Sequence, residues 1–298
     1  MDLNLYLNFA GKNFIFSISI MIISFILGWL LYNGVILRKI CLKHALFEKD
    51  NVAAWIEFIG AFIFPTLYLA AQAVQGSASE NVWVDLLICM GYAAGYVVVL
   101  TGLRLLSGII VKMTSAADAH GKINLNVEIY TQKNIAAALF SVALSIIFVV
   151  IITIIDISSV DNFITSLLKI SEILIFTLVG IIAYCLILRR KTSLFKEIFI
   201  DNNPAAGFSF AGFVFAMEIL LSNLVLLQKE FDILELAVLS FLSMLILGLL
   251  SMMIKWLFAK IIKVDLWREV YEQNSFGAAI GQVALYVGIA NVIINFIR

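Results

Sequence analysis

The chain has 298 residues, of which 63% are hydrophobic and 13% are charged. Soluble domains carry about 25% charged and 45–50% apolar residues, so this composition excludes an ordinary soluble enzyme or binding domain. Equal numbers of basic and acidic residues, 20 of each, exclude a global attraction for nucleic acid. Three widely separated cysteines predict no metal site and no disulfide framework. We therefore expect an integral membrane protein without a cofactor.

Long apolar runs alternate with short polar stretches along the whole chain. About 20 apolar residues in a helix cross the roughly 30 Å hydrocarbon core of a bilayer. The pattern predicts an all-α integral membrane protein with eight transmembrane helices, forming a single membrane domain over residues 1–298. In chain order, the predicted spans are 14–37, 52–75, 82–111, 134–157, 163–188, 203–227, 232–262 and 275–297.

Basic residues are concentrated in every second loop, after the odd-numbered predicted spans. Because Lys-rich and Arg-rich loops stay in the cytoplasm, these loops are predicted to be cytoplasmic and both termini to lie outside the cytoplasm. The basic residues concerned are Arg38, Lys39, Lys43, Lys49, Lys112, Lys122, Lys133, Arg189, Arg190, Lys191, Lys196, Lys260, Lys263 and Arg268.

Four segments of the chain, 45–54, 128–137, 197–206 and 269–278, resemble one another. Each contains a strong N-cap residue, followed by small residues at the start of an even-numbered span. These anchors are Asn51, Asn134, Asn203 and Ser275. Small residues at such a place permit close helix packing, and a direct ligand-binding role for the anchors is the alternative. The segments predict four parallel two-helix repeats, at approximately 1–78, 79–160, 161–229 and 230–298.

The pattern Glu-Ile-x-x-x-x-Asn-x-Ala-Ala ahead of an apolar helix resembles the domain-of-unknown-function 350 family, the YjfL-like bacterial inner-membrane proteins. The resemblance covers nearly the whole chain as four two-helix units, and it departs from the pattern at two positions. Ser275 replaces Asn in the last unit, and Ala45 replaces Glu in the first. The resemblance implies a bacterial inner (plasma) membrane and an association with envelope-stress proteins, but no particular activity.

Ionisable side chains inside the predicted spans are candidates for a functional site, because charge at that depth is costly. Glu57 and Arg104 lie roughly 9 and 12 Å from the predicted cytoplasmic helix ends. They can pair between the second and third spans. Alternatively, each can extend separately toward the headgroups.

A second set of charged residues belongs to the third predicted repeat. Glu172 and Glu218 lie near the midplane, roughly 15 Å from the outer ends of their helices. Lys169 lies one turn before Glu172 and can pair with it. This set predicts an asymmetric binding site for a small cation or a proton, and a neutral structural network is the alternative.

Two functions from different classes follow from these features. The first is a small-solute or proton-coupled transporter that uses Glu172, Glu218 and Lys169. The second is a non-catalytic scaffold that recruits a cytoplasmic envelope-stress partner through its basic loops. We expect no enzyme, because the sequence contains no HExxH motif or other catalytic constellation. The expected partners are the lipid bilayer, a small cationic solute or proton, and a second copy of the chain in a homo-oligomer.

Overall fold

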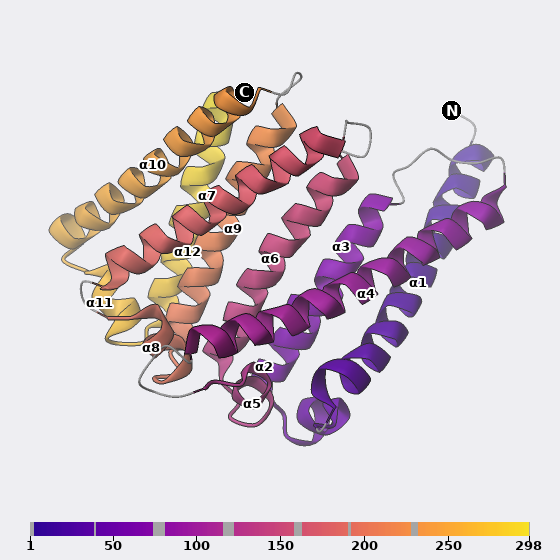
Figure 1. Cartoon of the computed structure of the whole chain (residues 1–298), viewed down its shortest axis with the longest axis horizontal. Coiled ribbons are helices and arrows are strands. Elements are labelled where there is room, and N and C mark those ends of the chain that lie inside the picture. The colour runs from indigo at the N-terminus through magenta and orange to yellow at the C-terminus, as the bar shows by residue number, and fades with distance from the viewer. Residues whose placement is uncertain are drawn as a thin grey trace. The chain divides into compact units, whose positions relative to one another are not determined.

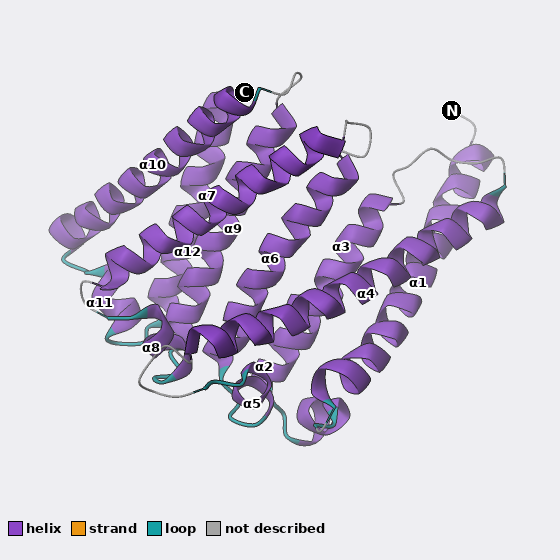
Figure 2. Ribbon diagram, viewed as in Figure 1, coloured by secondary structure: helices purple, strands orange, loops and turns teal. Residues whose placement is uncertain are grey.

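The computed structural model describes residues 3–38, 40–73, 81–115, 122–157, 163–189, 192–227 and 232–297. Within these ranges the chain is helical, and no strand occurs (Figure 2). Three of the predicted basic loop residues, Lys39, Arg190 and Lys191, lie outside the described residues.

Among the described residues, eight helical segments are long and apolar enough to cross a membrane, which confirms the predicted multi-pass membrane protein. The predicted boundaries differ from the observed ones by about one helical turn at most. The observed segments are Phe14–Leu37, Val52–Gln72, Val82–Ser115, Ile135–Ile155, Ile164–Arg189, Pro204–Leu227, Ile233–Ile262 and Phe276–Ile297.

The chain consists of two compact units, Met1–Asn126 and Val127–Arg298. The boundary falls inside the predicted repeat 79–160, so the two compact units do not coincide with pairs of predicted repeats. The predicted single membrane domain and the predicted repeat boundaries stay predictions.

The first unit contains the first three spans and short connecting helices (Figure 1). Its elements are α1 (Leu3–Leu31), the π-helices η1 (Tyr32–Leu37) and η2 (His44–Glu48), α2 (Val52–Trp55), the π-helix η3 (Ile56–Ile63), α3 (Phe64–Ala73) and α4 (Val82–Ser115).

The second span is π-helical between α2 and α3, immediately before Pro65. Proline has no N–H to donate, so the normal α-helical bond to the carbonyl four residues earlier cannot form. The N–H of Phe64 bonds to the carbonyl of Ile59, five residues earlier, and the hydroxyl of Thr66 donates to the carbonyl of Phe62 at 2.8 Å. The wider turns place Glu57 inside the π-helix, a geometry that is frequent at functional sites.

Aromatic side chains fill the interior of the first unit around the end of the first span. The Tyr32 ring lies 5.2 Å from Phe58 and 5.1 Å from Phe62, edge to face in both pairs. All three side chains are buried. This cluster fixes Tyr32 beside η3, where its hydroxyl reaches Glu57.

The described part of the second unit contains five spans, with one short helix before the first of them and two short helices between later ones (Figure 1). Helix α5 (Leu125–Tyr130) begins at the end of the first unit. The other elements are α6 (Ile135–Ile157), α7 (Phe163–Arg189), α8 (Leu194–Phe199), α9 (Pro204–Leu227), α10 (Ile233–Leu257), the π-helix η5 (Phe258–Ile262), α11 (Leu266–Tyr271) and α12 (Phe276–Ile297).

Helix α9 is the central element of the second unit, and it contacts α6, α7, α10 and α12. Gly207 permits the approach to α6, because a Cβ atom there would lie 2.9 Å from the Cα of Ala136. Gly212 permits the approach to α12 in the same way, against Val283. The predicted close packing after the anchor thus occurs on α9. By contrast, Gly277 and Gly281 on α12 are exposed, and no atom lies within 4 Å of the position that a Cβ would occupy.

Candidate functional site

The four predicted helix caps share one local geometry. The Oδ1 atoms of the three asparagines accept from the backbone N–H three residues later, at 2.9–3.2 Å. Ser275 does the same with its Oγ, which accepts from the N–H of Ala278 at 3.4 Å. The structure therefore places Asn51, Asn134, Asn203 and Ser275 at helix starts as side-chain caps.

The residue before each cap has a left-handed backbone. The φ angles are 46° at Asp50, 59° at Lys133, 48° at Asn202 and 53° at Asn274. In each case the N–H of the cap residue donates to the carbonyl six residues earlier. This arrangement ends one helix and starts the next within a single tight turn.

Two of the caps also join neighbouring parts of the second unit. Asn134 Nδ2 donates to Glu128 Oε2 at 3.1 Å and to the carbonyl of Ile198 on α8 at 2.9 Å. Asn203 Nδ2 donates likewise to Glu197 Oε2 at 2.9 Å and to the carbonyl of Val270 on α11 at 3.0 Å. Both amides are buried and fully engaged in these bonds, which favours a structural role over ligand binding.

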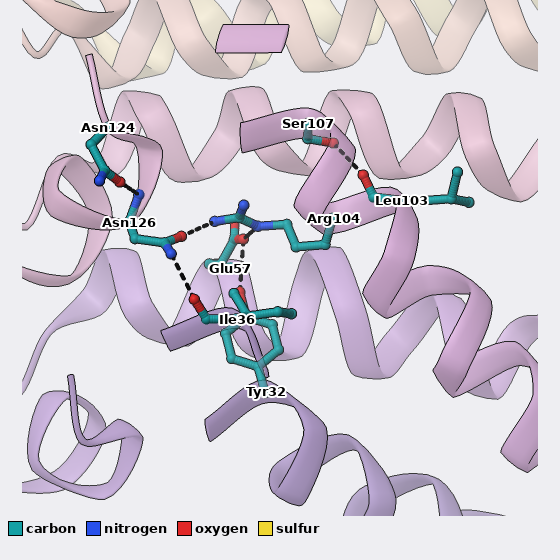
Figure 3. A network of polar contacts seen from close by, with 8 residues as sticks. All are labelled: Tyr32, Ile36, Glu57, Leu103, Arg104, Ser107, Asn124 and Asn126. Carbon is teal, nitrogen blue, oxygen red and sulfur yellow. Dashed lines mark hydrogen bonds and ion pairs between the residues drawn. The ribbon is translucent and has the colours of Figure 1, made fainter. Parts of the chain in front are cut away.

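In the first unit, Glu57 and Arg104 form an ion pair (Figure 3). This is the first of the two predicted alternatives, the other being separate extension of each side chain toward the headgroups. Arg104 Nε donates to Glu57 Oε1, and the hydroxyl of Tyr32 donates to the same oxygen at 2.8 Å. The Glu57 side chain is 0% exposed and the Arg104 side chain 8%. Pairing at this depth keeps both charges in the apolar interior.

The guanidinium of Arg104 continues this network to the end of the first span. Its Nη2 donates to Asn126 Oδ1 at 2.9 Å, and Asn126 Nδ2 donates to the carbonyl of Ile36 at 2.8 Å (Figure 3). Tyr32 and Asn126 were not predicted from the sequence, because neither belongs to the motif or to the set of charged residues. Their contacts join three spans, and among the described residues Glu57 Oε2 has no hydrogen-bond partner.

In the second unit, Glu218 is a fully buried carboxyl group on α9. Thr177 on α7 donates its hydroxyl to Glu218 Oε1 at 2.6 Å. The other oxygen, Oε2, has no hydrogen-bond partner, and no cationic side chain pairs with Glu218 among the described residues. A buried carboxylate in this state is costly unless a proton or cation is present.

Glu172 on α7 is also buried, and Ser240 on α10 donates to its Oε1 at 3.3 Å. Within the described part of the chain, its Oε2 likewise has no hydrogen-bond partner. The predicted pair of Lys169 with Glu172 is not among the ion pairs of the described residues. Both carboxyl groups are thus linked to α7: Glu172 belongs to this helix, and Glu218 accepts a hydrogen bond from Thr177 on it. No hydrogen bond joins the two carboxyl groups directly.

A third polar cluster, absent from the sequence-based candidates, lies where α7, α9, α11 and α12 meet. Tyr184 and Tyr271 share a hydrogen bond, and the Tyr184 hydroxyl lies 3.3 Å from Ser209 Oγ. Ser209 donates to Gln282 Oε1 at 2.5 Å. Burial, reinforced by Tyr286, raises the pKa of Tyr271, so this hydroxyl keeps its proton.

Lys255 on α10 lies close to this cluster and donates to the hydroxyl of Tyr286 at 2.6 Å. It is half-buried and forms no ion pair with any described residue. A signal for it was present in the sequence, since a lysine interrupts the apolar run of the seventh span before the basic residues at its end.

Comparison with protein families shows similarity in the second unit. The family model of the Domain of Unknown Function (DUF350) matches residues 158–297, which include α7 to α12. The matched range contains Glu172, Glu218 and Lys255, whereas Glu57 and Arg104 lie outside it. Neither the curated proteins nor the solved structures give a match to this chain.

Proposed function

The chain belongs to the DUF350 family through residues 158–297, and from this premise we propose that it is a proton-coupled transporter of a small solute. The observation that carries the proposal is Glu218, a buried carboxyl group with an unpartnered oxygen inside a membrane span. Ionisable groups in such positions are expensive, and they commonly mark proton relays or ion pathways.

Glu172 supplies a second carboxyl group in the same part of the protein. Residues 172 and 177 lie about 7.5 Å apart along α7, so Thr177 brings Glu218 within a short path of Glu172. Each carboxyl group accepts a bond from a hydroxyl, and hydroxyls can both donate and accept protons. These contacts support a relay in which Glu172 and Glu218 exchange a proton, with Lys169 one turn away on the same helix.

Proton movement in proteoliposomes tests this function. Full-length protein is reconstituted with a pH-sensitive dye inside the vesicles, and a membrane potential is imposed. We expect dye-reported proton uptake that is lost in the Glu172→Gln/Glu218→Gln double variant, because a carboxamide cannot release a proton. Glu235→Gln, at an exposed carboxyl group on α10, should retain uptake. Uptake by the double variant equal to that of the unchanged protein would remove these residues from the mechanism.

We further propose that the four caps occupy equivalent positions in four two-helix repeats. The support is local: the same side-chain cap, the same left-handed residue before it and the same bond to the carbonyl six residues earlier occur at each position. Function then resides in the residues that the repeats do not share, chiefly Glu172 and Glu218.

The scaffold remains the second candidate, and the short helices favour it. Exposed ion pairs lie at the ends of α8 and α11, Lys196 with Asp201 at 3.3 Å and Arg268 with Glu272 at 3.3 Å. We propose that the basic loops 38–51 and 189–202 then recruit an envelope-stress partner. Neutralising their basic residues should abolish recovery of that partner in a pull-down while leaving proton uptake unchanged. Unchanged recovery would exclude this recruitment by the loops.

A further inference from the structure

The second unit contains a cavity of about 370 Å³ between α7 and α10. Most of its wall is apolar. The wall residues include Phe176, Gly180, Phe241, Met244 and Gly248. Its volume falls within the range of small-molecule sites, about 300–1,000 Å³.

One end of the cavity is polar and carries a positive charge. Lys255, Tyr286, Tyr271 and Tyr184 line this end. An ammonium group has three N–H donors, and Tyr286 accepts only one of those of Lys255. The remaining donors and the neighbouring hydroxyls suit an anionic group with several acceptor oxygens, such as a phosphate.

The apolar part of the cavity extends along the outer surface of the helix pair. Phe241 and Leu245 line the cavity and are themselves 56% and 46% exposed on the face of an apolar span. The wall continues from Phe176 to Leu188 on α7, about 18 Å of helix. This length is similar to one leaflet, about half of a 30 Å hydrocarbon core. Lys255 lies about 10 Å from the end of the span at Ile262, and a lysine side chain can extend toward the headgroup from that position.

We propose that this cavity is a binding site for an anionic phospholipid of the surrounding bilayer. Its phosphate binds Lys255 and the hydroxyl groups of Tyr286 and Tyr271, and one acyl chain lies between α7 and α10. Two features together select this occupant: an apolar groove open on a lipid-facing surface, and a cation at its end without an acidic partner among the described residues. The site uses neither Glu172 nor Glu218, so it goes beyond the proposed transport function.

Native mass spectrometry of the full chain tests the site by measuring bound lipid. The protein is released from detergent after incubation with phosphatidylglycerol or, separately, phosphatidylcholine. We expect tighter binding of phosphatidylglycerol, weakened about five- to tenfold by Lys255→Gln, as for the loss of one charge-assisted contact. Lys260→Gln removes the same charge from an exposed lysine that stacks over Trp256. This variant should bind phosphatidylglycerol as tightly as the unchanged protein does.

A second variant tests the apolar part independently of charge. Gly248→Leu fills the groove, and the new Cβ has nothing within 4 Å to displace. It should reduce binding of phosphatidylglycerol, whereas Gly288→Leu, at an equally open glycine on α12, should not. Equal binding of the two lipids, or unchanged binding in both Lys255→Gln and Gly248→Leu, would overturn the proposal. The Glu172→Gln/Glu218→Gln variant should bind phosphatidylglycerol as the unchanged protein does. Failure of the transport proposal can therefore be told apart from failure of the lipid-binding proposal.

Discussion

Arg104 on α4 and Glu57 on the π-helix η3 form an ion pair in which neither side chain is more than 8% exposed. Tyr32 donates to Glu57 and Asn126 accepts from Arg104, so residues from three spans and a connecting segment take part in the network. A buried pair of this kind is weak evidence for net stability, but removal of one partner leaves an uncompensated charge. The coupling energy between Glu57 and Arg104 is therefore measured by changing each residue alone and both together.

Arg104→Met should lower the free energy of unfolding by about 3–5 kcal/mol, because it leaves Glu57 buried without its cation. The Arg104→Met/Glu57→Gln double variant should lose less than the sum of the two single changes. Unfolding by a denaturing detergent, followed by circular dichroism, gives the three values. Glu48→Gln removes an exposed carboxyl that pairs with His44 at 2.5 Å, and it should change stability little. Additive losses would show that the pair is not coupled.

Asn203→Ser separates the helix-capping role of Asn203 from its role in bridging to neighbouring elements. Serine can still accept from the N–H of Ala206, as Ser275 accepts from Ala278, but it has no amide to donate to Glu197 and Val270. We expect a loss of about 1–3 kcal/mol in the same unfolding measurement, since two buried acceptors lose their donor. Ser275→Ala loses only a cap and should cost about 1 kcal/mol. A smaller loss for Asn203→Ser than for Ser275→Ala would contradict the bridging role.

Gly207→Ala tests the close approach of α6 and α9. The added Cβ would lie 2.9 Å from both the Cα and the carbonyl oxygen of Ala136, and backbone atoms cannot move aside locally. We expect a destabilisation of about 1–3 kcal/mol in thermal unfolding. Gly281→Ala makes the same change at an open helix position and should be neutral or stabilising by up to about 1 kcal/mol. Equal effects at the two glycines would argue against a packing requirement at Gly207.

The sequence predicted the spans and caps because both depend on local properties. Apolar runs determine which residues form membrane helices, and an Asn before small residues specifies a helix start within a few positions. The bridges from Asn134 to Ile198 and from Asn203 to Val270 depend on tertiary packing, which no local pattern encodes. Glycine patterns alone were equally insufficient, since Gly207 is packed against a backbone and Gly281 is open.

The candidate site was predicted only as a set of charged residues. Depth in the helix identified Glu57, Arg104, Glu172 and Glu218, all of which are buried. Their partners, including Tyr32, Thr177 and Ser240, are common side chains in apolar helices, and their hydrogen bonds connect different spans. Lys255 was not predicted, because a basic residue near the end of a span is typical of the adjoining loop.

Glu128 gives a pH dependence of stability outside the spans. Burial raises the pKa of Glu128, although the bond from Asn134 opposes this shift. Above its unfolded pKa of about 4.5, the unfolded chain releases this proton before the folded protein does, so the folded state loses stability as pH rises through the folded pKa. Glu128→Gln should remove this loss in unfolding measured from pH 4 to pH 8. Glu48→Gln, at a carboxyl whose pKa is lowered by His44, should not remove it. Identical pH profiles for Glu128→Gln and the unchanged protein would contradict the assignment.

Labelling of the native Cys41 side chain can determine the orientation of the chain in the membrane. It is exposed between the first and second spans, whereas Cys89 is buried and Cys185 half-buried. If the basic loops are cytoplasmic, a membrane-impermeant maleimide should label Cys41 only after the membrane is opened. Asn81→Cys, exposed at the start of α4, should label in intact cells once Cys41 is changed to serine. Labelling of Cys41 in intact cells would reverse the proposed orientation. It would also place Lys255 toward the outer leaflet, so the lipid headgroup would then have to come from that side of the membrane.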